Sequence, residues 1–239
     1  MAFTFIASAT GTSDASGTSL ACSSSLNIAA GDLLVALVRW ESATTTPSIA
    51  GATNTLTMVN TFSFATAVGW GVMGYKIAAS ADGAETFTFS VAAARTWRRV
   101  IILQFRPDSG DTVTLDASNA FASGNSATIA SGNISTTGTD EVVVGGTDTW
   151  VTFTASNVFI NGSAATGSVF SLPHCGMWYA KLTATFTNGN ASLTSSVSQY
   201  WGADIIAFKS VAGGGGGVTY PQLERGIRGL ERGVYSGGL

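Results

Sequence analysis

The chain has 239 residues, enough for one large domain or two small ones with a sizeable core. Charged residues make up only 10% and the formal net charge is -3, so the composition gives no electrostatic reason to expect nucleic acid or an anionic membrane as a partner. No uninterrupted apolar stretch of about 18 residues is present, which argues against a membrane-spanning helix.

The first residues, MAFTFIASATG, lack the basic start and the long apolar run of a secretory signal peptide. We therefore expect synthesis in the host cytoplasm, without a signal peptide. The abundance of Ser, Thr, Ala and Gly and the scarcity of Lys are nevertheless typical of proteins exposed outside cells. A protein made in the cytosol but suited to the exterior fits a virus particle, so the composition favours a virion location.

Alternation of apolar and polar residues with a period of two predicts β-strands along most of the chain. The predicted strands of the first half cover residues 2–8, 31–40, 55–64, 69–79, 85–91 and 97–105. Those of the second half cover residues 112–118, 126–136, 140–149, 176–186, 190–197 and 203–210. Clusters of Gly, Asn, Ser, Asp and Pro separate them, as in turns, and no window before residue 218 has a convincing helical period.

The order of the predicted strands is itself repeated, at an offset of roughly 103 to 109 residues. The matching segments are GDLLVALV with DEVVVGGT, GVMGYKI with GMWYAKL, ETFTFSV with ASLTSSV, and WRRVIILQFR with YWGADIIAFK. This alignment makes Lys76 equivalent to Lys181 and Phe105 equivalent to Phe208. Two halves of about 105 residues therefore share one pattern.

Many short strands at regular spacing predict an all-β protein, an antiparallel β-sandwich of the jelly-roll-like type with pseudo-repeated halves. The halves cover about residues 1–107 and 108–212. They form either one pseudo-symmetric sandwich or two small tandem sandwiches. Because the junction RPDSGD is shorter than a flexible linker between domains, we prefer a single sandwich domain over residues 1–212.

Candidate ligands for a metal ion are few. Cys22 and Cys175 could form a disulfide, but cytosolic synthesis favours two free thiols in the core. His174 is the single histidine and abuts Cys175, which falls short of the three or four ligands that a metal site requires. We expect neither a metal ion nor another cofactor.

The acidic residues do not form a recognisable catalytic pattern. Asp82 precedes Gly83 in a predicted turn, near Glu85, and Asp140 and Glu141 begin a strand in which neighbouring side chains point to opposite faces. No GxSxG nucleophile motif is present, and the glycine run lacks the Lys and Ser/Thr of a phosphate-binding loop. We therefore expect a protein that is not an enzyme.

Two kinds of residue leave alternatives open. Most of the six tryptophans lie in or beside apolar strands, which favours a place in the core, but Trp150 follows a polar turn and is a candidate aromatic for binding a ligand such as a sugar. Arg98 and Arg99 interrupt an apolar strand. They either protect the edge of a sheet or contribute to a protein interface, and we favour the edge.

The C-terminal segment, residues 218–239, contains LERGIRG followed at once by LERGVYS and is joined by a glycine linker, residues 213–217. Its apolar residues recur at intervals of four, three and four, as in one stripe of a helix. Each of its glycines costs about 1 kcal/mol relative to Ala in a helix, so the segment cannot hold a helix alone. It is either an end without a role or, as we expect, an extended arm that orders on binding a partner. The residues expected to bind are Tyr220, Leu223, Arg225, Ile227, Arg228, Leu230, Arg232, Val234 and Tyr235.

Over about residues 20–210 the pattern resembles a class of β-sandwich structural proteins encoded by tailed bacteriophages. The segments that carry the likeness are GDLLVALVRWES, TPSIAGATNTLTMVNT, GYKIAASADGAETFTFSVAAARTWRRVIILQF, DEVVVGG and ADIIAFKS. The resemblance rests on the strand pattern and supplies no catalytic residues. It implies a structural role, in capsid decoration or as an accessory of the tail.

We therefore expect a phage virion structural protein, and first a capsid decoration (cement) protein that stabilises the shell through its sandwich and its arm. Its partners would be the major capsid protein or another virion protein, and it would form a homo-oligomer, such as a trimer, without nucleic acid or a membrane. The alternative is a host-recognition or carbohydrate-binding module on the tail or shell, with Trp150 in its site.

Overall fold

The structure is a computed structural model that describes residues 3–41, 46–64, 69–108, 110–118, 121–171 and 174–212. These residues form β-strands joined by turns and bends and contain no helix, so the predicted all-β antiparallel sandwich is confirmed. It follows that this part of the chain has no helix long and apolar enough to cross a membrane. The predicted linker and arm, residues 213–239, lie outside the described residues.

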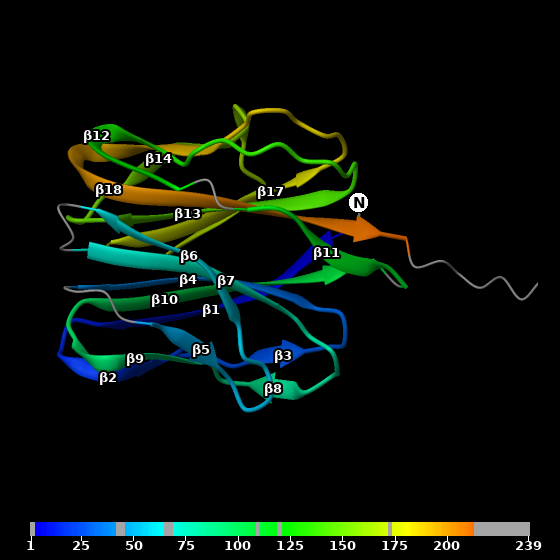
Figure 1. The fold of residues 1–239 in the computed structure, drawn as a ribbon, viewed down its shortest axis with the longest axis horizontal. Helices are drawn as coiled ribbons and strands as arrows, with labels where there is room; N and C mark the ends of the chain where they lie inside the picture. Colours follow the sequence, from blue (N-terminus) through cyan, green and yellow to red (C-terminus); the bar gives the residue numbers. More distant parts are fainter. Residues whose placement is uncertain are drawn as a thin grey trace, which may run out of the picture.

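The first half of the chain builds two layers (Figure 1). Its large sheet consists of β1 (Phe3–Ser13), β10 (Arg98–Pro107), β4 (Leu33–Glu41), β7 (Gly69–Ile77) and β6 (Thr57–Phe64), in that order. Its outer layer consists of a three-stranded sheet, β2 (Gly17–Ala21), β9 (Thr88–Arg95) and β5 (Ser48–Ala50), and a two-stranded sheet, β3 (Leu26–Ile28) and β8 (Gly83–Glu85).

The second half forms one eight-stranded sheet in which β18 takes part in both layers. Its main path is β15 (Ser163–Ala164), β14 (Ala155–Ile160), β18 (Ala191–Val211), β13 (Glu141–Thr149), β17 (Cys175–Leu182) and β16 (Gly167–Ser171). Two further strands, β11 (Thr112–Ala117) and β12 (Ala122–Ala130), also pair with β18. The N-terminal part of β18 pairs with β14 and β12, and its C-terminal part with β13 and β11.

The two halves have the same strand order. The sheet β1-β10-β4-β7-β6 corresponds to β11, the C-terminal part of β18, β13, β17 and β16. The sheet β2-β9-β5 corresponds to β12, the N-terminal part of β18, and β14. Strands adjacent in the chain cross between layers, as in Greek-key sandwiches. The repeat in the sequence is therefore a repeat of strand order, while the finer jelly-roll assignment stays a prediction.

The alignment of the repeat needs one correction. Phe105 pairs with Leu33, which pairs with Ile77, and the equivalent series in the second half is Phe208, Val142 and Lys181. The equivalent of Lys181 is therefore Ile77 and not Lys76. A shift of one residue moves each side chain of a strand to the opposite face of the sheet. The matching of similar residues in the sequences of the two halves did not detect this shift, and the strand pairing in the structure corrects it.

Within the described part of the chain, three hydrophobic cores hold the four layers together. One lies inside the first half, between its large sheet and its outer layer, and includes Trp40 and Phe89. Another lies inside the second half and includes Trp178. The third joins the halves, because Val35 and its neighbours on β4 pack with Val144 and its neighbours on β13. The halves are thus two sandwiches stacked through their large sheets (Figure 1).

The stacking explains the continuous apolar runs of the sequence. On β4, the side chains of Leu33, Val35 and Leu37 enter the core between the halves, whereas Leu34 and Ala36 enter the core of the first half. Strands covered on both faces do not need alternating polar residues, so β4, β10 and β13 have buried residues on both sides.

Candidate functional site

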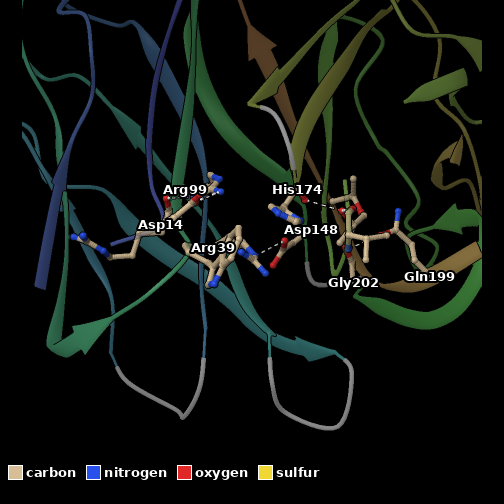
Figure 2. A network of polar contacts seen from close by, with 12 residues as sticks. Asp14, Arg39, Arg99, Asp148, His174, Gln199 and Gly202 are labelled. Carbon is tan, nitrogen blue, oxygen red and sulfur yellow. Dashed lines mark hydrogen bonds and ion pairs between the residues drawn. The ribbon is translucent and has the colours of Figure 1, made fainter. Parts of the chain in front are cut away.

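A buried polar cluster lies where the large sheets of the two halves meet, and Figure 2 shows it from close by. Nε of Arg39 on β4 lies 2.8 Å from Oδ1 of Asp148 on β13, and these side chains are 1% and 0% exposed. The guanidinium of Arg39 also donates a hydrogen bond to the carbonyl oxygen of Trp97, at 3.1 Å. The pair therefore connects the halves through charges that are shielded from water.

Arg99 and His174 complete this cluster. The guanidinium of Arg99 donates to Oδ1 of the largely exposed Asp14, at 2.5 Å, and lies 5.7 Å from the ring centroid of Trp97. The ring of Trp97 meets the ring of His174 edge to face, with centroids 5.3 Å apart. Trp97 has a φ of 51°, in the left-handed region, at the turn between β9 and β10. The tight turn thus places an aromatic ring between Arg99 and His174.

The protonation of the cluster follows from its burial. Burial, together with the positive charges of Arg39 and Arg99, lowers the pKa of His174 to about 4. Burial raises the pKa of Asp148 to about 7, although Arg39 opposes the shift. His174 is therefore neutral at neutral pH. Because Arg39, Asp148 and Arg99 are all enclosed, the cluster is suited to aligning the halves rather than to binding a substrate.

The interpretation of Arg98 and Arg99 as edge protection is wrong. They begin β10, which lies between β1 and β4 and is not an edge strand. Arg98 donates hydrogen bonds to the carbonyl oxygens of Ser19 and Ala15, in and before β2, while Arg99 points to the junction with the second half. Both side chains are buried, so neither contributes to an exposed protein interface.

A second ionic cluster lies at the other end of β13. Glu141 is buried beside Asp116, whose carboxylate accepts hydrogen bonds from Lys209 Nζ, at 2.8 Å, and from Thr137. Burial and the hydrogen bond with Asp116 raise the pKa of Glu141 to about 7. Burial acts on Asp116 too, but the hydrogen bonds from Lys209 and Thr137 outweigh it and lower its pKa to about 2. The two groups thus behave as a carboxylic acid beside a carboxylate.

The equivalent position of the first half also carries an ion pair. Arg106, which corresponds to Lys209, donates from Nε and Nη2 to the two carboxylate oxygens of buried Asp32, at 2.7 and 2.8 Å. Gln104 donates to the same carboxylate at 2.6 Å. Burial of Asp32 is outweighed by these hydrogen bonds, so its pKa is lowered. Each half therefore fixes the end of its large sheet with a cation at the same place.

The structure shows the surroundings of the two acidic pairs noted in the sequence, and neither pair consists of two carboxyl groups facing each other in an open site. Asp82 and Glu85 share the amide of Asn54, whose Nδ2 donates to both carboxylates at 2.9 and 2.8 Å. Gly83, between them, has a φ of 67°, consistent with the predicted turn. Glu141 is buried at the start of β13, while Asp140 precedes the strand and is exposed. The partner of Glu141 is Asp116, which lies too far away in the sequence to have been recognised.

The two cysteines are free, as predicted, and both are buried. Cys22 belongs to the core of the first half and Cys175 to the core between the halves. Within the described residues, no group of three or more His, Cys, Asp and Glu side chains is arranged to hold a metal ion. Two surface depressions of about 340 and 320 Å³ are lined mainly by loop residues and include neither the buried cluster nor Trp150.

The tryptophans divide as the sequence predicts. Trp40, Trp178 and Trp201 are buried, whereas Trp150 is 38% exposed. The backbone N–H of Trp150 donates to the carbonyl oxygen of Tyr200, at 3.0 Å, and Tyr200 is 45% exposed. The sequence provided no reason to select Tyr200, because Tyr200 lies beside Trp150 only through the pairing of β13 with β18.

Val151 and Val197 are also exposed, and they lie on the same two neighbouring segments of chain as Trp150 and Tyr200. We call these four residues the aromatic end patch: Trp150, Val151, Val197 and Tyr200. Buried Gln199 organises it from below, because its Oε1 accepts from the N–H of Val151 at 2.8 Å and its Nε2 donates to Ser195 at 3.0 Å. Ser195 in turn donates to the carbonyl oxygen of Val197, at 2.8 Å. The patch therefore rests on a fixed backbone.

The residues predicted to bind a partner through the arm, from Tyr220 to Tyr235, lie outside the described residues, and that prediction stays open. The last strand of the described residues, β18, ends at Val211, before the predicted linker and arm. No family model, curated protein or solved structure matches the chain.

Proposed function

We propose that the chain is a structural protein of a tailed-bacteriophage particle, and more narrowly a capsid decoration protein that stabilises the shell. The resemblance of its strand pattern to phage β-sandwich proteins supports a place in the virion. Its composition, poor in charged residues and rich in hydroxyl groups, is consistent with a surface outside the cell. Its partners are the major capsid protein, another virion protein or sister copies of the chain.

The observation that supports this proposal is that the aromatic end patch and the end of the last described strand, which precedes the predicted linker and arm, lie at opposite ends of one extended segment. The aromatic end patch includes Tyr200, and β18 ends at Val211, before the predicted linker and arm. Residues 201–209 of β18 pair continuously with β13, so this part of the strand is extended. At about 3.3 Å per residue, the patch and the start of the arm are about 36 Å apart. A body of this kind can connect two neighbours.

Such a connection would stabilise a shell by adding buried area between subunits. Exposed apolar side chains that gather in one place typically mark contact surfaces. Each contact need not be strong, because contacts linked in one chain act at a raised effective concentration. The pairing of β18 with β13 keeps Tyr200 and Val211, at the two ends of this segment, at a fixed separation, so that a contact at one end restrains the other.

Deletion of residues 213–239 tests the role of the arm. All strands of the described residues end by Val211, so we expect the melting temperature to change little. Incorporation into particles, or the resistance of particles to heat, should decrease. Equal incorporation of the truncated and full-length chains would contradict a role of the arm in decoration.

A second candidate function, a host-recognition or carbohydrate-binding module, is favoured by the exposed pair of Trp150 and Tyr200. Aromatic side chains with a few polar neighbours are typical of small-molecule sites. A glycan array probed with the full chain and with Trp150→Ala tests it. Binding that disappears in the variant would support this function, and absence of binding or an unchanged profile would argue against it.

A further inference from the structure

We propose that the aromatic end patch is the receptor for the C-terminal arm of a second copy of this chain, so that copies associate head to tail. This inference deepens the proposed function by naming the surface on which the arm docks. It rests on the expected role of the arm as a binding segment.

The patch has the chemistry that the arm requires. Its four exposed side chains are two aromatic and two branched aliphatic groups, held on adjacent segments of chain. The arm offers an apolar stripe of the same character, formed by Leu223, Ile227, Leu230 and Val234. Docking an apolar stripe into a preformed apolar surface is a common way of recognising a short segment. Gln199 and Ser195 fix the backbone of the patch, which reduces the entropy lost on binding.

The distances favour the arm of a neighbour over the arm of the same chain. From Val211 to Leu223, a fully extended chain spans at most about 43 Å. A glycine-rich segment of that length has a typical end-to-end distance of about 17–21 Å. The patch of the same chain lies about 36 Å from Val211. To place Leu223 on that patch, the chain would have to be stretched to about twice its typical end-to-end distance, whereas a copy stacked end to end can bring its patch close to Val211.

The contact is heterologous, because the patch and the arm are different surfaces of the same chain. One copy can thus give its arm to a second copy while it receives the arm of a third. If the rotation between successive copies closes, the result is a ring, and a trimer is one such ring. If it does not close, the result is a row of copies.

Sedimentation velocity of the purified full-length chain, over a wide range of concentrations, tests the proposal. We design three variants: a patch variant (Trp150→Ser with Tyr200→Ser), an arm variant (Leu223→Ser with Ile227→Ser), and a control (Ile6→Ser with Leu115→Ser). Ile6 and Leu115 are as exposed as Trp150, at 38% and 37%, but lie outside the patch. We expect the full chain and the control to associate, and the patch and arm variants each to associate more than about tenfold more weakly.

Mixing identifies the partners. The patch variant keeps an arm and the arm variant keeps a patch, so a mixture of the two should form a dimer that grows no further. Association of either variant as tight as that of the full chain would overturn the proposal. So would a monomeric full chain, or a mixture that stays monomeric. Unchanged melting temperatures of the variants would show that the loss is not due to misfolding.

The proposed function fails on a different observation, the absence of the protein from phage particles. Self-association of the purified chain does not depend on that result. If glycans compete for the patch while the arm does not bind it, the second candidate function is supported and the head-to-tail contact is excluded.

Discussion

Arg39 and Asp148 occupy equivalent positions in the two halves and pair with each other across the junction, with Nε and Oδ1 2.8 Å apart. The equivalence follows from the matched registers of β4 and β13, in which Leu33 corresponds to Val142. Leu37 and Gly146 are equivalent in the same way, and a Cβ on Gly146 would lie 3.2 Å from Cδ2 of Leu37. Equivalent residues that face each other indicate an approximate twofold relation between the halves. Identical charges at such a position would repel, and the two halves carry opposite charges there.

Replacement of Asp148 by Ala should leave Arg39 buried and without its counter-ion. Breaking a buried ion pair by removing one partner typically costs about 3–5 kcal/mol of unfolding free energy. We expect a loss of this size in urea unfolding at pH 8. The double variant Arg39→Met with Asp148→Leu should recover most of it, since apolar replacements avoid the unpaired charge. A double variant as unstable as Asp148→Ala would contradict the pairing.

Two adjacent glycines of β13 face different cores. Gly145 faces the core inside the second half, and Gly146 faces the core between the halves. A Cβ on Gly145 would clash with Cβ of Ala191 and would lie 2.8 Å from Cε2 of Trp178. We expect Gly145→Ala to cost about 1–3 kcal/mol, as overpacked cores do. At Gly146 the nearest atoms, on Leu37 and Met73, are 3.2 and 3.3 Å away and belong to flexible side chains. Gly146→Ala is the matched control and should have the smaller effect on the melting temperature.

Glu141 should make the stability fall as the pH rises. Its pKa is about 7 in the folded chain and about 4.5 when unfolded, so the folded state binds more protons between these values. Its contribution is complete below about pH 4.5 and is lost as the pH rises towards 7. We expect Glu141→Gln to be more stable than the wild type at pH 8 and to flatten this slope. Glu85→Gln is the contrast, because hydrogen bonds from Asn54 and Thr53 outweigh the burial of Glu85 and lower its pKa. If Glu141→Gln were less stable than the wild type at pH 8, the carboxyl would not be protonated as described.

His174 should act in the opposite direction. The pKa of His174 is lowered from 6.5 to about 4, so the folded state binds fewer protons than the unfolded state between these pH values. The contribution of His174 to stability is therefore lost as the pH falls from 6.5 to about 4. Because the chain has one histidine, its ring signals can be assigned without ambiguity in an NMR titration. We expect no titration near pH 6.5 and a midpoint near pH 4. A midpoint at the ordinary value would show that water reaches the ring.

Much of the fold could be predicted because period-two patterns identify strands, and the repeat in sequence identified the equivalent halves. The shortest strands escaped prediction. Examples are β5 (Ser48–Ala50) and β15 (Ser163–Ala164), where three or two residues give no periodicity to recognise. The stacking of the halves was also missed, although the apolar run of β4 contained its signal, burial on both faces.

The site was less predictable, because it depends on contacts between distant segments. Trp150 was identified from its polar surroundings, but Tyr200 joins it only through the pairing of β13 and β18. Arg39 interrupts an apolar run in the first half, and Asp148 lies at the equivalent place in the second, between Thr147 and Thr149. An alignment with the correct register would have related them. The pairing of Asp116 with Glu141 has no such signal, since these two residues are not equivalent to each other in the repeat.

The number of copies per particle tests the proposed decoration role most directly. It can be measured by quantitative mass spectrometry of intact phage particles that carry the gene, with the major capsid protein as the internal reference. We predict many copies per shell, in a fixed ratio to the major capsid protein. A few copies per particle, or none, would contradict capsid decoration.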